Sequence, residues 1–416
     1  MEPNVKRDGN FATLTLIVSI IVFSGAFLEQ ALLGTSLNRN ASSAARALNS
    51  AAYILAYLPG LVLLIVHRQR LRDVMGAFTP ILILSSLSLT SVLWALDPIY
   101  TALDALQLAL TLTTSMGLAI ALSPERFIHI TLVTLAAILG ASLLYILAFP
   151  DYGRMSYDGA STLVGLPQGV FTHKNKLAEV ASLALLVAVC ARGREPFWLV
   201  YLTLALGFGL LIVAQSAGKY YAFLLAVTIY GALRILVRLR FGPVLALFYA
   251  VLIFGALVLL LPTLLPLVLE FIGKDETLSG RTQIWAHALT LIADRPILGY
   301  GAGSIWRSEL GAVPGVLYYQ PPHAHNVMLD QMLMTGMVGT LLLAVFIVDV
   351  VRRGLQRPVL PVDMFFSMLT LSLLIRGMFD SALARGNQIG FLMMLAALGV
   401  MVAARRKREA QCVLER

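Results

Sequence analysis

Long apolar runs alternate with short polar segments along the whole of this chain. Each run is close to 20 residues long and carries few charges, which is the pattern of an α-helix that crosses the hydrocarbon core of a bilayer. We count twelve such runs, at residues 11–33, 49–66, 74–95, 100–122, 127–149, 174–191, 197–214, 219–237, 244–270, 325–350, 363–382 and 387–404. The pattern predicts an all-α polytopic membrane protein with about 12 transmembrane helices, forming one transmembrane domain over residues 1–416.

The composition and the placement of charge agree with this prediction. Of the 416 residues 59% are hydrophobic and only 13% are charged, against about 25% in soluble chains. If both termini are cytoplasmic, 19 of the 31 Lys and Arg residues lie on the cytoplasmic side, as the positive-inside rule requires. The net charge of +9 therefore reports topology, and no soluble basic face is left that would bind nucleic acid.

Three of the predicted outer segments are long, at residues 34–48, 150–173 and 271–324. The last, a periplasmic loop between the ninth and tenth spans, is too long to be only a connection, and such loops are usually functional. Within it, residues 281–296 carry apolar side chains at helical spacing: Ile284, Trp285, Ala288, Leu289 and Ile292. We expect short amphipathic helices at the membrane boundary, with Trp285 as an interfacial anchor.

Arg281 lies in the first turn of that predicted helix, where the helix dipole favours an anion. A phosphate shared by the helix amides and the guanidinium would explain this placement, and a solvated arginine is the alternative. The glycine-rich residues 298–304 follow no strand of a βαβ unit, so we interpret them as a tight turn and exclude a nucleotide loop.

The stretch PPHAHNVMLDQMLMTGMVG, residues 321–339, sets two histidines at the mouth of an apolar helix. Helical geometry places His325, Gly336 and Gly339 on one face. We expect the glycines to let a neighbouring helix approach closely, with His325 at the aqueous end of the same face.

These residues resemble the O-antigen ligase and polymerase family of polytopic glycosyltransferases, which have a GT-C-like architecture. The motif is His-Asn, nine residues, then Gly-x-x-Gly, met by His325-Asn326 and by Gly336 and Gly339. Further similar stretches are Gly280-Arg281 with Ile284-Trp285, Pro296 to Gly301, residues 169–179 and residues 215–219. The resemblance runs from about residue 160 to the end of the chain.

The resemblance implies transfer of an assembled glycan from undecaprenyl diphosphate on the periplasmic face of the inner membrane of a Gram-negative bacterium. Ligases of the family use the lipid A–core oligosaccharide as acceptor, and polymerases use another lipid-linked glycan. No cofactor and no metal are implied. The partners would be donor, acceptor and membrane lipids, with no nucleic acid; the oligomeric state is left open and a monomer is assumed.

Cationic side chains would stabilise the departing diphosphate in such a reaction. The outward-facing candidates are Arg281, Lys219 and Arg376, and ligases commonly have an arginine in the region of Lys219. Arg376 lies inside an apolar run, where a charge is functional by default. Asp380, one turn further on, is its expected partner, and an ion pair that only locks two spans is the alternative.

His325 is our candidate for the general base that takes the proton of the acceptor hydroxyl, or for a group that orients the acceptor. Asn326 is expected as a hydrogen-bonding support, and His323 as a substrate contact turned to another side. His173 and Lys174 would bind phosphate or core sugar, or anchor the chain at the interface. No third ligand near His323 and His325 is evident in the sequence, so we expect no metal. The sequence shows no paired-carboxylate motif of the kind that a double displacement uses, so we expect a direct attack that inverts the anomeric configuration.

Three classes of function are therefore compared. An O-antigen ligase comes first, because only one outer loop is very long. A glycan polymerase that uses the same donor is the second enzyme reading. A polytopic transporter is the non-enzyme reading. It would be expected to show repeated halves and charged or broken helices near the midplane, whereas the sequence has one large asymmetric outer loop and charge gathered at the outer rim.

The topology is tested by reporter fusions. We expect a reporter inserted between residues 300 and 320 to read periplasmic, and one fused after residue 408 to read cytoplasmic, because of the distribution of Lys and Arg. Alkaline phosphatase and green fluorescent protein fusions measure this in intact cells. Finding both positions on one side of the membrane would contradict twelve spans.

Overall fold

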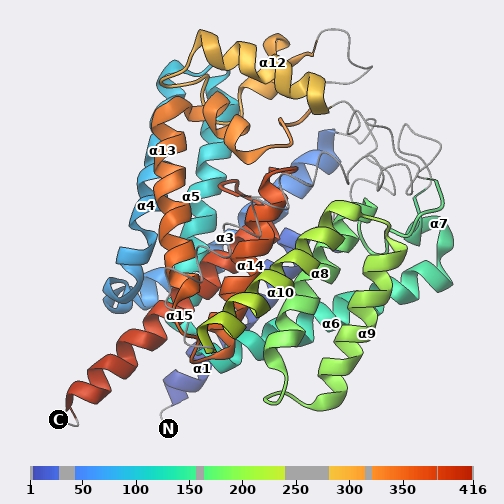
Figure 1. Ribbon diagram of the computed structural model, residues 1–416, viewed down its shortest axis with the longest axis vertical. Helices are drawn as coiled ribbons and strands as arrows, with labels where there is room; N and C mark the ends of the chain where they lie inside the picture. The colour runs from blue at the N-terminus through green and yellow to red at the C-terminus, as the bar shows by residue number, and fades with distance from the viewer. Residues whose placement is uncertain are drawn as a thin grey trace.

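A computed structural model of the chain describes residues 3–27, 43–155, 164–238, 281–313, 321–381 and 383–414. Within these ranges every regular element is an α-helix or a 3₁₀-helix, apart from one isolated bridge between Arg154 and Pro167. Both termini lie at the same end of the molecule (Figure 1). The prediction of an all-α protein is confirmed for the described residues.

Helices occupy eleven of the twelve predicted ranges, and the twelfth, 244–270, lies outside the described residues. Their bounds are α1 (Pro3–Ser24), α3 (Ser43–Val66), α4 (Arg72–Thr90), α5 (Pro98–Ala121), α6 (Pro124–Ala148), α8 (Lys174–Ala191), α9 (Phe197–Val213), α10 (Ala217–Arg238), α13 (Val327–Leu355), α14 (Pro361–Gly377) and α15 (Ile389–Leu414). Between α6 and α8 lies the single turn α7 (Pro150–Gly153).

Five of the described helical segments are long and apolar enough to cross a membrane by themselves: Arg72–Trp94, Pro98–Ala121, Pro124–Ala148, Val327–Leu355 and Ile389–Val413. Shorter apolar helices cover Gly9–Ser24, Ala51–Val66 and Phe197–Val213. A multi-pass membrane protein is therefore supported, while the number twelve and the periplasmic side of residues 271–324 stay predictions.

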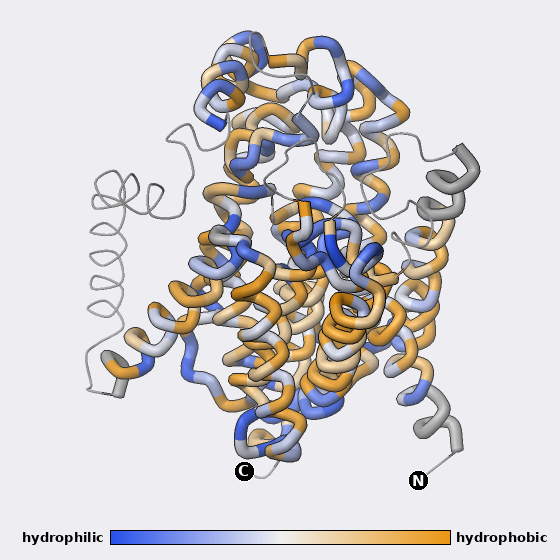
Figure 2. Tube along the Cα trace, turned by 90° about the vertical axis from the view of Figure 1, so that its right-hand side faces the viewer, coloured by the Kyte–Doolittle hydropathy of each residue, from blue (hydrophilic) through white to orange (hydrophobic). Residues whose placement is uncertain are grey.

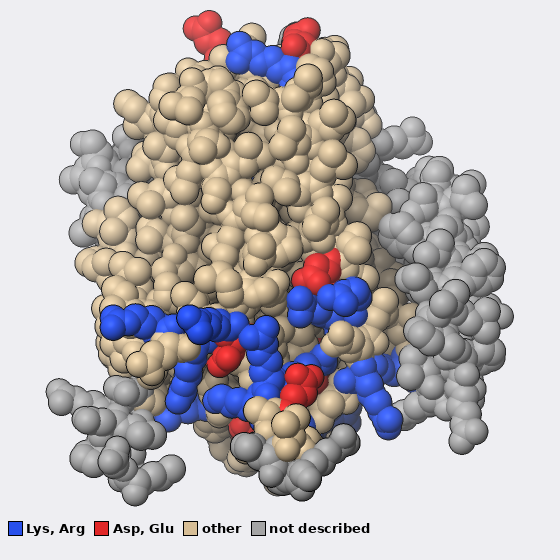
Figure 3. All heavy atoms as spheres, turned by 90° about the vertical axis from the view of Figure 1, so that its left-hand side faces the viewer, with Lys and Arg blue, Asp and Glu red and all other residues tan. Residues whose placement is uncertain are grey.

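The surface has the character of a protein that lies in lipid. Large apolar side chains are exposed along the helices, among them Leu93 at 86%, Phe197 at 77% and Val348 at 66%. Hydrophobic residues dominate the helices in Figure 2, and Figure 3 shows a broad uncharged surface with Lys and Arg gathered in a band near one end. Water would disfavour so large an apolar surface, whereas lipid chains do not.

The helices begin where the sequence supplies caps. Asp97 accepts hydrogen bonds from the amides of Ile99 and Tyr100 at the start of α5, which has proline at its first position. Ser123 caps α6 in the same way through Arg126. Such caps satisfy amides that have no partner inside the helix, so they fix where each helix leaves the bilayer surface.

The amphipathic helix predicted in the long loop is present as α12 (Arg281–Asp294), which lies across the end of the bundle above α13 (Figure 1). It buries Ile284, Ala288 and Leu291 in a small core of its own with Trp306. The indole of Trp285, which we expected to anchor the helix in the membrane boundary, is half-buried and donates a hydrogen bond to the Ala324 carbonyl at 2.8 Å. It therefore ties α12 to the segment that leads into α13.

Helix α13 is interrupted at Gly336, whose φ of 64° and ψ of −159° are open in practice only to glycine. The turn 296–301 docks its backbone there: the amide of Tyr300 donates to the Leu333 carbonyl at 2.8 Å, and that of Met337 to the Pro296 carbonyl at 2.8 Å. A Cβ atom at Gly336 would lie 2.2 Å from the Ile297 carbonyl oxygen.

Two expectations about this region are thus resolved differently. The glycine-rich stretch is a tight turn as predicted, with positive φ at Gly299, Gly301 and Gly303. The single helical face of His325, Gly336 and Gly339 is wrong, because the helix breaks at Gly336 and the close neighbour is this turn instead of another helix.

We expect Gly336→Ala to destabilise the protein by at least about 1–3 kcal/mol, because it places a side chain in a glycine-only conformation. Gly354→Ala is the matched control in the same helix, since its new Cβ would have only ordinary contacts, 3.5 Å or more from Ser367. Thermal unfolding in detergent, followed by intrinsic fluorescence, compares the two variants. Equal melting temperatures for both would contradict the docking of residues 296–301.

Candidate active site

A group of charged side chains lies where α8, α10 and α14 approach the start of α13. The Lys219 ammonium donates to the Asp380 carboxylate, and an Arg376 Nη2 lies 3.7 Å from the same oxygen. The same Nη2 donates to Glu179 Oε1 at 2.9 Å. Because the side chains of Arg376 and Glu179 are each only 6% exposed, their charges are costly to bury and are matched one against the other.

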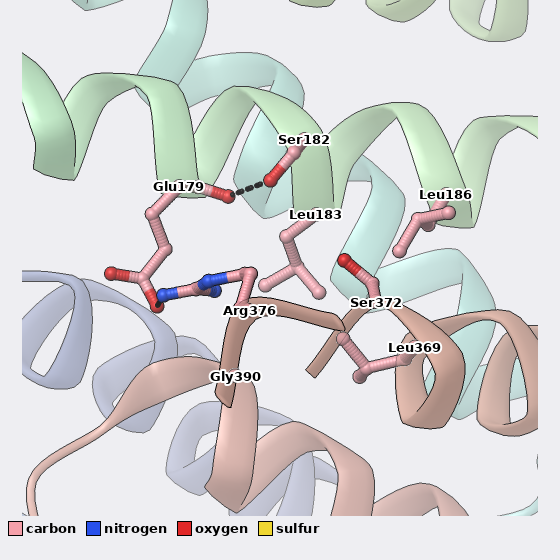
Figure 4. Close-up of a pocket in the computed structure, with 8 residues that line it drawn as sticks. All are labelled: Glu179, Ser182, Leu183, Leu186, Leu369, Ser372, Arg376 and Gly390. Carbon is pink, nitrogen blue, oxygen red and sulfur yellow. Dashed lines mark hydrogen bonds and ion pairs between the residues drawn. The ribbon is translucent and has the colours of Figure 1, made fainter. Parts of the chain in front are cut away.

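Figure 4 shows the Arg376 guanidinium turned toward the Glu179 carboxylate between α8 and α14. The cavity beside them is about 10 Å³, enough for a water molecule at most. Our sequence prediction paired Arg376 with Asp380, and that ion pair is present. Its hydrogen-bonded partner is Glu179, however, so Arg376 both locks α14 to α8 and holds Asp380.

His323 and His325 lie against this group. Their ring centroids are 4.1 Å apart at an angle of 63°, and the His325 amide donates to His323 Nδ1 at 3.2 Å. The His323 Nδ1 is therefore an acceptor, and its other nitrogen, Nε2, faces Asp380 Oδ1 at 4.0 Å. The expectation that His323 turns to another side is wrong: both rings belong to one cluster.

The turn that presents the histidines is held from several directions. Asp330, in the first turn of α13, accepts hydrogen bonds from Trp306 Nε1 at 2.8 Å and from the Ala324 amide at 2.9 Å, and it also accepts one from the Ser381 hydroxyl. These bonds hold His325 at a φ of 54°, a left-handed conformation that is unusual for histidine. A strained backbone that the surroundings maintain is typical of functional sites.

Asn326 has a definite structural part in the same turn. Its side-chain oxygen accepts hydrogen bonds from the amides of Met328 at 3.0 Å and Leu329 at 3.2 Å, so it is the N-cap of α13. This fits the predicted role of support, because the cap fixes the helix that follows His325. Direct contact of Asn326 with substrate stays a prediction.

Both histidines are neutral at physiological pH. Burial and, to a smaller extent, the charges of His323 and Arg281 together lower the pKa of His325 to about 3, against the opposing effect of Asp380. Burial likewise lowers the pKa of His323 to about 4, assisted by the charge of Arg385. A neutral imidazole can accept a proton, which an imidazolium cannot.

Two arginines complete the site. Arg281, the first residue of α12, acts electrostatically on both histidines, so the structure brings it to the same cluster as Lys219 and Arg376. Arg385, which follows α14, was not singled out in the sequence. Its Nε is buried and has no hydrogen-bond partner among the described residues. Proximity to Asp380 in the sequence was the signal that could have identified it.

His173 and Lys174 lie at the start of α8 and have structural contacts there. The His173 Nδ1 accepts from the Asn175 amide at 3.0 Å and caps the helix, and Lys174 Nζ donates to the Gln215 carbonyl at 3.2 Å. Residues 169–179 and 215–219, which both resemble stretches of the glycosyltransferase family, are thus neighbours in space. Binding of phosphate or sugar by His173 and Lys174 stays a prediction.

The arrangement also bears on a metal. The ligand atoms of His323, His325 and Asp380 lie within 4.8 Å of one another. The expectation that no third ligand lies near the histidines is therefore wrong. The carboxylate is nevertheless already engaged by Lys219 and Arg376, and the charges of Arg281 and Arg385 act on the rings. A divalent cation at this place would have to compete with these cations for the carboxylate and would be repelled by them.

We expect the imidazoles of His323 and His325 to stay neutral from pH 8 down to about pH 5, against an ordinary pKa of about 6.5. Arg281→Gln should move the His325 titration to higher pH, because it removes a positive charge that lowers that pKa. Histidine-labelled protein in detergent, titrated by NMR and assigned with His325→Gln, measures both. A His325 titration near pH 6.5 in the wild-type protein would contradict the buried, cation-rich site.

Two comparisons with known proteins agree with this site. Residues 202–344 match the family model described as O-antigen ligase, a segment that contains Lys219, Arg281, His323, His325 and Asn326. The chain is 28% identical, over 313 residues and 70% of each protein, to the exopolysaccharide production protein ExoQ of Rhizobium meliloti. Members of this family are glycosyltransferase-like membrane enzymes. The resemblance seen in the sequence is confirmed: both comparisons support a membrane protein similar to the ligases and polymerases of the O-antigen ligase family.

Proposed function

We propose that this protein transfers an assembled glycan from undecaprenyl diphosphate to a hydroxyl of an acceptor glycan, on the periplasmic side of the inner membrane. The observation that carries the proposal is the pair of neutral histidines on Asp380, placed beside cations at the mouth of α13. A base next to an anion site is what attack on a lipid diphosphate sugar requires.

The cations of the site divide into two groups. Lys219 and Arg376 form ion pairs with the carboxylates of Asp380 and Glu179, so their positive charge is largely neutralised within the protein. Arg281 and Arg385 act electrostatically on the two histidines, beside which the acceptor hydroxyl would attack. We assign these two arginines to the diphosphate of the donor, whose negative charge grows as the glycosidic bond breaks.

His325 takes the proton in this mechanism. As the acceptor oxygen bonds to the anomeric carbon, the bond from that carbon to the diphosphate breaks, and the electron pair leaves with undecaprenyl diphosphate. The hydroxyl proton moves to neutral His325. A bound diphosphate offsets the charge of Arg281, which raises the His325 pKa toward neutrality and makes the imidazole a better base once the donor is present. Direct attack of this kind inverts the anomeric configuration.

His323 is a positioning residue in the same mechanism. Its ring contacts that of His325, its Nδ1 accepts from the His325 amide, and its Nε2 faces Asp380. Asp380 therefore acts on His323 by charge, and His323 in turn orients the His325 ring by direct contact. Loss of His323 should affect transfer more than the sequence alone suggested.

The identity of the acceptor distinguishes two candidate functions. We propose ligation to the lipid A–core oligosaccharide first, because the matched family model is described as O-antigen ligase. The second candidate is polymerisation of a lipid-linked glycan, which is favoured by the similarity to ExoQ, an exopolysaccharide production protein. Neither comparison points to the transporter reading.

Purified protein in lipid vesicles, supplied with undecaprenyl diphosphate-linked glycan, tests the proposal. His325→Ala should lower the transfer rate by about 10²–10⁴-fold, since this is the usual contribution of a general base. Arg281→Ala should abolish transfer, and Arg281→Lys should restore little, because lysine lacks the bidentate geometry of a guanidinium. His287→Ala is the control, a histidine of α12 that hydrogen-bonds to the Leu310 carbonyl instead of joining the cluster.

The acceptor is decided in the same assay. Product on rough lipopolysaccharide identifies a ligase, whereas longer lipid-linked chains formed from donor alone identify a polymerase. Full activity of His325→Ala would remove this histidine from the mechanism. Loss of wild-type activity on addition of a chelator would instead assign a metal to His323, His325 and Asp380.

A further inference from the structure

A second cavity lies at the end of the bundle opposite to the histidines. It has a volume of about 250 Å³ and lies where the start of α4, the turn between α5 and α6 and the last turns of α15 meet. Its charged lining residues are Arg70, Asp73, Glu125, Lys407 and Arg408. The proposed glycan transfer uses none of these residues.

The five charged side chains are not paired with one another. No salt bridge joins any of them to another residue in the described part of the chain, and the one hydrogen bond is a long contact of 3.5 Å from Arg70 to the Ile120 carbonyl. Neighbouring charges at the same end of the bundle do form pairs: Arg353 with Asp349 at 2.7 Å, and Arg405 with Asp363 at 3.5 Å. The cavity therefore keeps opposite charges apart across an open space.

The floor of the cavity is apolar. Its buried lining side chains come from α5, from the residues before α6 and α14, and from α15, namely Ala119, Ile120, Leu122, Leu360, Val400 and Ala403. A ligand that fills this space needs charged groups of both signs at the rim and an uncharged part beneath them. At about 250 Å³ the cavity is smaller than the about 300–1,000 Å³ that drug-sized ligands occupy, so a compact group is required.

We propose that this cavity binds the zwitterionic headgroup of a phospholipid that carries a phosphate and a primary ammonium, as phosphatidylethanolamine does. The phosphate is recognised by Arg70, Lys407 and Arg408, and the ammonium by Asp73 and Glu125. The glycerol carbons cover the apolar floor. Figure 3 shows a band of Lys and Arg at the border of the uncharged surface, which is the level at which headgroups lie.

The two carboxylates decide between kinds of lipid. A headgroup with phosphate alone, such as phosphatidylglycerol, could meet the same three cations but would leave Asp73 and Glu125 without a cation to pair with. A choline headgroup has a cation without N–H groups, so it cannot donate hydrogen bonds to the carboxylates. Primary ammonium is the headgroup cation that satisfies both requirements.

Native mass spectrometry of the full-length protein tests this, with bound lipid counted after equilibration in equal mixtures of phosphatidylethanolamine, phosphatidylglycerol and phosphatidylcholine. We expect retention of phosphatidylethanolamine over the other two. The double variant Lys407→Gln, Arg408→Gln should lower that retention about fivefold, the effect of two partly exposed ion pairs. Asp73→Asn should remove the preference over phosphatidylglycerol.

The matched controls are Arg357→Gln and Glu409→Gln, exposed charges at the same end of the bundle that do not line the cavity; both should bind as the wild type does. Soluble phosphoethanolamine that displaces the lipid supports recognition of the headgroup itself, and displacement by inorganic phosphate alone counts against the ammonium contact. Equal retention of all three lipids, or wild-type retention by the Lys407 and Arg408 double variant, would overturn the proposal. The readout is bound lipid, so its result is independent of glycan transfer.

Discussion

The ion pairs of the Asp380 carboxylate hold the parts of the candidate site together. It accepts from Lys219 of α10, lies 3.7 Å from Arg376 of α14 and faces His323 at 4.0 Å, while Arg376 continues to Glu179 of α8. In a medium of low dielectric each charge would be expensive alone, and removing one partner of a buried pair costs about 3–5 kcal/mol. Three helices and the segment of the histidines are thereby fixed relative to one another by the need to pair charges.

The pairing of these charges allows the two histidines to lie close to several cations while their imidazoles stay neutral and able to accept a proton. The charges of Lys219 and Arg376 are offset by carboxylates, so they organise the site without attracting a second carboxylate into it. Burial keeps the imidazoles neutral. In the proposed mechanism, a donor diphosphate would meet the positive charge of Arg281 and Arg385 beside neutral imidazoles.

Local patterns in the sequence were enough for the helices and for the short motifs. Apolar runs located the described helices, the spacing of Ile284 and Ala288 predicted α12, and the glycines of residues 298–304 predicted the turn. Contacts between residues that are far apart in the sequence could not be predicted from these local patterns. Glu179 is 197 residues from Arg376, and nothing in its apolar helix marks which charge it will meet. The role of Asp330 as acceptor for Trp306, Ala324 and Ser381 likewise depends on the packing of separate segments.

The turn 296–301 is bonded to both sides of the break at Gly336. The amide of Tyr300 donates to the Leu333 carbonyl in the outer part of α13, and the amide of Met337 in the inner part donates to the Pro296 carbonyl. The outer part is also tied through Asp330 to Ala324, whose carbonyl accepts a hydrogen bond from Trp285 of α12. The position of α12 and the geometry of the histidine turn are therefore coupled, because neither can change without disturbing hydrogen bonds that hold the other.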